Sequence, residues 1–249
     1  MKKDPFSLFF DRGVGVYCGN VKETKLHAHH AIEIVFALSG CFKVVDKFGI
    51  QEKYQLVLIP NDIQHQFVAI NDVTPVFIYL DPFHDIGKAL TSRFKLNKEI
   101  VGLNVIPNQH IFTNLHLWRS GKDINIFETV AALAHQLTGT GFYTNESDER
   151  ILKSIENIHA DLHMDIRIKD IASKAHLSES RYAHLFKEQV GIPFRRFVLW
   201  TRLQTTVKSV IEGNSLTSAC YDGGFSDLPH FSKTFFDMFG VPPSSVLKG

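Results

Sequence analysis

Histidine and glutamate side chains, which bind metals and small polar ligands, occur close together near the start of the sequence. His27 and His29 are separated by one residue, Glu33 follows four positions after His29, and His65 comes after the next apolar run. Residues of equal parity point to the same face of a strand. The spacing therefore predicts that His27, His29 and Glu33 share one side, while His30 points elsewhere. Imidazole and carboxylate groups together suit Zn, Fe, Mn, Ni or Cu.

Three interpretations of this His/Glu cluster (His27, His29, Glu33 and His65) follow from the residue types. In the first, all four side chains are ligands of a divalent metal. In the second, they line a metal-free pocket and hydrogen-bond a sugar or a similar small effector. In the third, they form a structural hydrogen-bonded cluster near the mouth of a barrel. The residue types alone leave all three open, and no cofactor is assigned with certainty.

The sequence around the cluster predicts β structure. From about Val14 to Leu80, short apolar runs rich in Val, Ile and Phe alternate with turn signals that contain Gly, Asn and Asp. Several short strands at this spacing are typical of an antiparallel barrel or sandwich. The run from Ile32 to Leu38 is apolar at nearly every position. This strand is therefore expected to be buried on both sides.

The spacing of the cluster resembles the two motifs of the cupin superfamily. The pattern H-x-H-x3-E-x6-G extends from His27 to Gly40, and P-x4-H extends from Pro60 to His65. In metal-bearing cupins these positions supply three histidines and one glutamate to a divalent ion inside a small barrel. The second motif departs from the pattern, because Asp62 stands where a turn glycine is usual.

The stretch from Asp123 to Leu137 predicts an amphipathic helix, because its apolar residues recur at intervals of three and four. Its apolar face must be buried, either on the chain's own barrel or in a homodimer interface, and the two are not exclusive. The following residues, GTGFYTNES, are rich in turn formers and suit a linker.

The last hundred residues contain a helical repeat. Each half has a short helix, a tight turn and a second helix that ends in Gly-x-Pro or Gly-x-x-Pro. Ser178 is expected to cap the second helix of the first half, and Asp227 that of the second half. A long helix from Pro193, in its first turn, to about Glu212 joins the halves. This architecture can place one helix of each half in a major groove.

The second half carries a family signature. Its order of Gly-Phe, a polar cap, HFSK-x-F and FG-x-PP resembles the AraC/XylS family of transcriptional regulators, over roughly residues 150–249. The resemblance implies two helix-turn-helix units that bind double-stranded promoter DNA. Thr206 stands near the position where the family usually has Ala, and Ala219-Cys220 also depart from the pattern. We expect these departures to repack the core without changing the fold.

Helix geometry separates a core stripe from an outward face on each recognition helix. The stripe residues are Tyr182, Leu185 and Phe186 in the first helix and Phe231, Phe235 and Met238 in the second. The outward residues, which match the positions that the family uses for base contacts, are Ser180, Ala183, His184, Lys187, Leu228, Pro229, Ser232 and Lys233. The residues expected to contact phosphate are Arg181, Arg195 and Arg196.

Composition restricts the class of protein. With 44% hydrophobic and 21% charged residues the chain is expected to fold, and a net charge of +1 neither supports nor excludes a nucleic-acid partner. No apolar run reaches the roughly 18 residues that span a bilayer. The widely spaced Cys18, Cys41 and Cys220 are expected to be reduced thiols. The sequence therefore predicts a cytoplasmic protein without a membrane partner.

The sequence predicts a two-domain α+β protein with four parts: a cupin-like antiparallel sensor barrel (1–85), a helical extension (86–140), a linker (141–149) and an all-α DNA-binding domain (150–249). We expect a non-enzymatic regulator controlled by a small-molecule effector. The expected protein partners are a second copy of the chain, in a homodimer, and RNA polymerase if the protein is an activator. The alternative is a cupin-type metalloenzyme with an accessory helical domain. The effector, the operator and the direction of regulation are not determined by the sequence.

Overall fold

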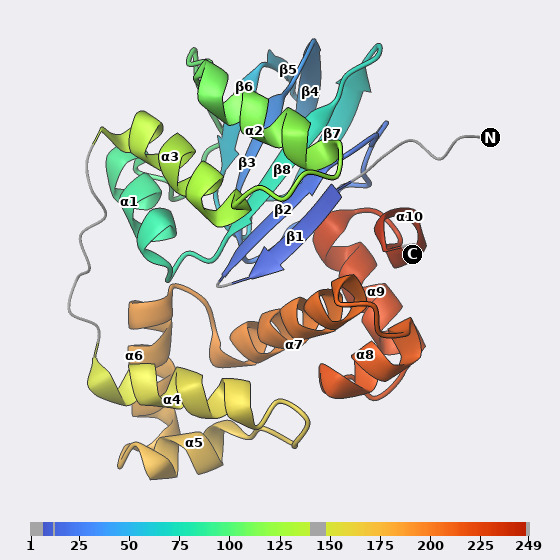
Figure 1. Ribbon diagram of the computed structural model, residues 1–249. Coiled ribbons are helices and arrows are strands. Elements are labelled where there is room, and N and C mark those ends of the chain that lie inside the picture. The colour runs from blue at the N-terminus through green and yellow to red at the C-terminus, as the bar shows by residue number, and fades with distance from the viewer. Residues whose placement is uncertain (1–6, 12, 140–147, 248–249) are drawn as a thin grey trace. The chain divides into compact units, whose positions relative to one another are not determined.

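The computed structural model describes residues 7–11, 13–139 and 148–247 (Figure 1). The chain divides into two compact units. The first contains Met1–Phe142 together with Phe236–Val246, and the second contains Tyr143–Phe235 with Leu247–Gly249. Most of the predicted linker lies outside the described residues. Within the described part of the chain, no helix combines the length and the apolar character needed to cross a membrane.

The first unit is built on two antiparallel sheets. The larger sheet has the strand order β1-β2-β8-β3-β6-β9, and the smaller has the order β5-β4-β7. The strands are β1 (Ser7–Asp11), β2 (Val14–Cys18), β3 (Ile32–Ala37), β4 (Cys41–Asp46), β5 (Gln51–Tyr54), β6 (Leu56–Ile59), β7 (His65–Ile70), β8 (Pro75–Leu80) and β9 (Val101–Gly102). The predicted antiparallel architecture is confirmed, although the described strands form two sheets and not one closed barrel.

One strand precedes the predicted β region. The prediction began at Val14, but Ser7–Asp11 forms β1 and pairs antiparallel with β2, with Phe9 opposite Val16. The apolar triplet Leu8–Phe10 is too short to signal a strand by itself. Its pairing partner β2, in which every residue is buried, supplies the template.

Three helices cover one face of the larger sheet (Figure 1). These are α1 (Asp85–Phe94), α2 (Gln109–Arg119) and α3 (Ile126–Thr138). The predicted amphipathic helix is confirmed as α3, which buries Val130, Leu133 and Leu137 in the core between the helices and the sheet. Its apolar face is therefore used within the chain.

Strand β3 is buried on both faces, as its continuous apolar run predicted. Ile32, Ile34 and Phe36 belong to the core beneath the helices. Because side chains alternate along a strand, Glu33 and Val35 point to the opposite face. On that face Val35 lies across from Phe77 of β8, and the Phe77 ring contacts Phe67 of β7 in the smaller sheet. Glu33 therefore lies on a buried face of the sheet, opposite the core beneath the helices.

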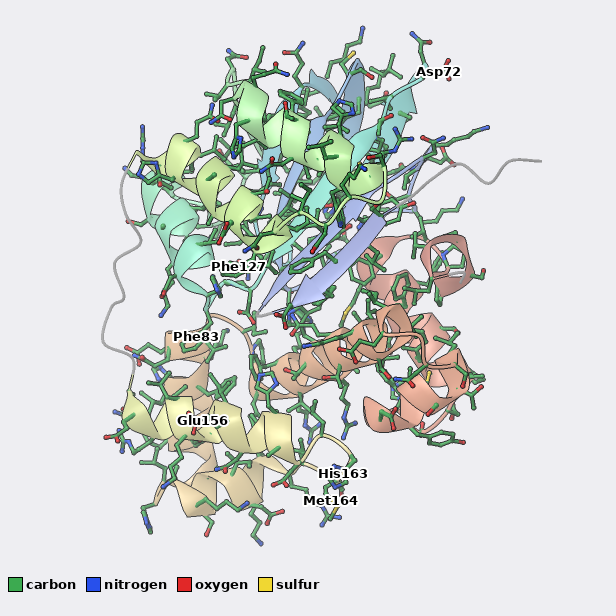
Figure 2. All side chains as sticks on the ribbon, in the orientation of Figure 1. Asp72, Phe83, Phe127, Glu156, His163 and Met164 are labelled. Atoms are coloured by element: carbon green, nitrogen blue, oxygen red, sulfur yellow. The ribbon has the colours of Figure 1, made fainter. Side chains whose placement is uncertain are left out.

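The helical repeat follows in the second unit. Its helices are α4 (Glu149–Ala160), α5 (Ile168–Lys174), α6 (Glu179–Val190), α7 (Phe194–Ile211), α8 (Leu216–Asp222) and most of α9 (Leu228–Phe239), and the short α10 (Pro243–Val246) follows in the chain. Helix α9 begins in the second unit and ends in the first, where α10 also lies. Figure 2 shows Glu156 on α4 and Met164, 58% exposed, in the loop that follows it.

The helix boundaries agree with the predicted caps. The Ser178 side chain accepts a hydrogen bond from the Arg181 N–H at the start of α6. Asp227 Oδ1 accepts one from the His230 N–H, 2.7 Å away, at the start of α9. Pro193 was predicted within the first turn of α7 and instead occupies the position before it. A proline there has no N–H to leave unpaired, so the difference is small in physical terms.

We predict that Asp227→Ala lowers the free energy of unfolding by about 1 kcal/mol, because an N–H at the start of α9 loses its acceptor. Asp227→Asn keeps a side-chain oxygen at the same place and is expected to lose much less. Thermal denaturation followed by circular dichroism measures both variants. Equal losses for Ala and Asn would show that the cap does not carry the effect.

Candidate DNA-binding and effector sites

The first helix-turn-helix unit consists of α5, a tight turn and α6. His176 in the turn has a φ of 56°, and the Leu177 N–H donates to the Ala172 carbonyl, which ends α5 sharply. Gly191, in the left-handed conformation, ends α6. The buried face of α6 holds Tyr182, Leu185, Phe186 and Val190. The predicted core stripe is thus the packed side of this helix.

The opposite side of α6 carries the four predicted base-contacting residues. Ser180, His184 and Lys187 are exposed and Ala183 is half-buried. Their spacing of three and four positions places them on one face of the helix. Within the described residues, the only ion pair of His184 is with Glu188. It is exposed, and 3.8 Å separate His184 Nδ1 from Glu188 Oε2. Such a pair is weak enough to be exchanged for a DNA contact.

The second unit repeats this plan with α8 and α9. The turn between them requires two glycines. A Cβ at Gly223 would collide with the Thr206 side chain, and Gly224 adopts a φ of 78°. Thr206 is fully buried, and its hydroxyl donates to the Arg202 carbonyl. This contact gives the departure from the family pattern a structural role in the turn.

On α9 the predicted outward residues are accessible to different degrees. Pro229 and Lys233 are exposed, whereas Leu228 and Ser232 are half-buried. Phe231 and Phe235 are buried, as predicted for the core stripe.

The three arginines predicted to contact phosphate are all exposed: Arg181, Arg195 and Arg196. Arg195 also lines a hollow of about 610 Å³ with three further basic residues, Arg167, Lys169 and Arg202. Asp165 and Glu179 line it as well. The sequence did not indicate this group, because Arg167 and Lys169 at the start of α5 meet Arg195 and Arg202 of α7 only through tertiary packing.

The His/Glu cluster is assembled in the first unit by a small backbone bridge. The His27 N–H donates to the His65 carbonyl at 3.0 Å, and the His65 N–H donates back to the His27 carbonyl at 2.9 Å. His29 follows in an irregular segment, and Glu33 lies on β3. The predicted continuous strand from His27 to Glu33 is therefore wrong, since β3 begins at Ile32. The side chains nevertheless converge, because the bridge supplies the placement that strand parity was expected to give.

The cluster is compact and buried. One ligating atom from each of His27, His29 and His65 lies within 4.8 Å of the others. Their ring centroids are 4.3 to 5.7 Å apart. The exposed fractions are 6% for His27, 0% for His29, and 1% for both Glu33 and His65. Nitrogen atoms this close together could hold a single ion.

The three imidazoles share one hydrogen-bonding arrangement. Nδ1 of His27, His29 and His65 lies 2.8 to 2.9 Å from the carbonyl oxygen of Lys25, Ala31 and Ile63, respectively. A carbonyl only accepts, so each Nδ1 must carry the proton and donate it. In a neutral ring this leaves the lone pair on Nε2. Histidines that bind metals are oriented in this way by an outer partner.

Glu33 closes the cluster with further acceptor atoms. Its Oε2 lies 3.1 Å from His29 Nε2 and 2.8 Å from His65 Nε2. The contact with His65 falls outside hydrogen-bonding geometry, so this buried Nε2 has no hydrogen-bond partner among the described residues. Nitrogen lone pairs that face a carboxylate at these distances repel one another. The cluster therefore requires a cation, either as added protons or as a metal ion.

The electrostatics of the cluster oppose added protons on His27. Burial, together with the neighbouring His65 and His29, lowers the pKa of His27 to about 3. Burial alone would raise the pKa of Glu33, but His65 and His29 hold it well below its usual range, so the carboxylate stays ionised. Three nitrogen donors and one carboxylate form a ligand set that suits a divalent transition metal. The residues thus fit the metal that the cupin resemblance implies.

The sequence did not indicate that Tyr79 and Asp62 contact residues of this region. Tyr79 lies opposite Glu33 in the register of β3 and β8, and its ring meets His29 edge-on at 5.2 Å. Burial and Glu33 raise the pKa of Tyr79 well above its usual value. Asp62, which stands where the cupin motif usually has glycine, has a φ of 61°. Its Oδ1 accepts a hydrogen bond from His30 Nδ1 at 2.8 Å. His30 therefore points elsewhere, as its parity predicted.

Comparison with known proteins supports the assignment of the helix-turn-helix domain. A family model described as a helix-turn-helix domain matches residues 171–249. The HTH-type transcriptional regulator YobQ of Bacillus subtilis is 28% identical over 222 residues, which cover 87% of this chain and 86% of YobQ. The regulatory protein PocR of Salmonella typhimurium is 30% identical over 99 residues, 39% of this chain. The chain spans only 33% of the length of PocR.

Solved structures of ToxT from Vibrio cholerae share the fold of the whole chain. The apo form of a ToxT point variant matches with a TM-score of 0.63 and 15% identity, and covers 96% of this chain and 98% of ToxT. ToxT with bound unsaturated fatty acid matches with a TM-score of 0.59 and 17% identity, over 99% of this chain and 95% of ToxT. A sheet-rich part followed by a helical part is common to both proteins. Residues 171–249 of this chain therefore form a helix-turn-helix domain, and the resemblance of the chain to the AraC/XylS family of transcriptional regulators is confirmed.

Proposed function

We propose that this protein is a sequence-specific DNA-binding transcriptional regulator whose affinity for promoter DNA depends on the occupant of the His/Glu cluster. The observation that carries the proposal is the duplicated helix-turn-helix plan. Each copy presents a capped recognition helix with a packed apolar face and an accessible polar face. Such a repeat can enter two successive major grooves about 34 Å apart. Acting on chromosomal DNA, the protein works in the cytoplasm.

The accessible faces supply the chemistry for base contacts. His184 on α6 and Lys233 on α9 donate hydrogen bonds to base acceptors, and Leu228 contacts a thymine methyl group. The other base-facing residues are Ser180, Ala183, Lys187, Pro229 and Ser232. Arg181, Arg195 and Arg196 neutralise phosphates and position the helices without specifying sequence.

A single divalent transition-metal ion is the occupant that the cluster fits best. His27, His29 and His65 would hold it through Nε2, with Glu33 as the carboxylate that balances its charge. Metal–nitrogen bonds of about 2 Å suit atoms as close as those in the cluster. The ToxT structure with fatty acid concerns an organic ligand of that protein. Here the converging lone pairs favour an ion.

The alternative, a cupin-type metalloenzyme, needs a coordination position that a substrate can reach. All four side chains of the cluster are at most 6% exposed. This burial favours a sensing site over a catalytic one. A homodimer, and a contact with RNA polymerase if the protein activates transcription, belong to the proposal as partners.

We predict that His184→Ala and Lys233→Ala each weaken binding to the preferred duplex by about five- to 150-fold, equivalent to roughly 1–3 kcal/mol. The preferred duplex is selected from a random pool, and fluorescence anisotropy over a salt series measures affinity. Lys98→Ala, an exposed change in the first unit, serves as the matched control and leaves binding unchanged. A protein that prefers no selected sequence over random duplex is not a sequence-specific regulator.

We predict that the protein binds one equivalent of Zn²⁺ or Co²⁺, and that His65→Ala weakens this binding by at least tenfold because one of three nitrogen donors is lost. Competition with a chromophoric chelator measures the affinity. His116→Ala, which removes an exposed imidazole from α2, is the matched control. Equal affinities of the two variants would place the metal elsewhere.

A further inference from the structure

Gly240, the residue that follows α9, lies next to His27 of the His/Glu cluster. Phe236–Val246 belongs to the same compact unit as the two sheets. The Gly240 carbonyl accepts a hydrogen bond from the Lys25 N–H at 2.8 Å. A Cβ built on Gly240 would lie 2.6 Å from the Lys25 oxygen and 2.8 Å from His27 Nδ1. Only a residue without a side chain fits this seat.

Lys25 connects this seat to a ligand of the cluster. Its N–H is bonded to Gly240, while its carbonyl accepts the proton of His27 Nδ1 at 2.8 Å. The same residue therefore anchors the C-terminal segment and orients the imidazole. A change in the position of Lys25 must alter both contacts.

A second contact joins the segment to the cluster from another direction. The Phe239 ring lies 5.0 Å from that of Tyr79, at an interplanar angle of 75°, and 6.5 Å from that of His29. Tyr79 in turn meets His29 edge-on. Phe239 is buried, with 7% exposed. Two of the three imidazoles therefore have a neighbour in the segment.

We propose that docking of the segment Phe236–Val246 and metal binding by His27, His29 and His65 stabilise each other; this inference rests on the proposed metal site. With the ion bound, the lone pairs on Nε2 are neutralised and the rings keep the orientation that seats Gly240. Without the ion, no common partner holds the three rings in this orientation, which weakens the seat. Coupling of this kind is reciprocal, so docking raises metal affinity by the same factor.

The coupling gives the metal a route to the DNA-binding residues. Helix α9 is continuous from Leu228 to Phe239. The segment Phe236–Val246 therefore begins with the last turn of the second recognition helix. A metal ion that holds Phe239 and Gly240 restricts the end of that helix. The ion then selects among arrangements of the recognition helix through its differential affinity for them.

Gly240→Ala tests the coupling in the full-length protein. The added Cβ meets Lys25 and His27, so we expect Zn²⁺ and Co²⁺ affinity to fall about tenfold, the lower end of the effect of losing an outer partner of a metal-bound histidine. Gly139→Ala is the matched control. Gly139 also follows a helix with a positive φ, 70° against 66° for Gly240, but nothing lies within 4 Å of its Cβ position. This variant is expected to bind metal with an affinity close to that of the wild type.

Hydrogen exchange supplies a readout that does not depend on the variants folding equally well. In the wild type, Zn²⁺ is expected to slow exchange of the Lys25 amide and of amides in Phe236–Val246, whereas His65→Ala removes this response. If the wild type binds metal but neither the exchange nor the affinity of Gly240→Ala changes, the coupling is wrong and the metal site stands. If the wild type binds no metal, both proposals are wrong.

Discussion

The pair of backbone hydrogen bonds between His27 and His65 positions the His/Glu cluster in the first unit. It joins the irregular segment before β3 to the first residue of β7, and these strands belong to different sheets. Side chains that extend from two bonded residues of this kind lie close together. The bridge therefore places two imidazoles side by side, and the irregular segment after His27 contributes a third, that of His29. The geometry of the cluster depends on this short contact.

Strand β3 separates two environments that differ in chemistry. On one face Ile32, Ile34 and Phe36 form an apolar core with the helices, where burial is favourable without further partners. On the other face Glu33 meets imidazoles whose Nδ1 protons are already donated to carbonyls. Burying a carboxylate among ring nitrogens is costly unless a proton or another cation lies between them. Natural folds tolerate such local conflict mainly at functional sites, and a bound cation removes it.

The helical unit follows simpler rules, because each recognition helix is specified locally. A capping side chain starts the helix, aromatic residues fill the packed face, and a left-handed residue ends it. These features leave the polar face free to vary with the operator. The end of α9 differs, since Phe239 and Gly240 belong to the unit of the two sheets and contact residues around the cluster. The positions of these two residues therefore depend on contacts with the cluster region as well as on the helix.

The sequence by itself determined what depends on near neighbours in the chain. Helical spacing and the caps Ser178 and Asp227 predicted the recognition helices, and the apolar run from Ile32 predicted a strand buried on both faces. Glu33 and the histidines were identified by spacing, although the strand expected to carry them does not extend to His27. Tertiary structure alone decided the pairing of β1, the register that sets Tyr79 opposite Glu33, and the seat of Gly240 on Lys25. These contacts join residues far apart in the chain, and a local pattern carries no information about which distant backbone will supply the partner.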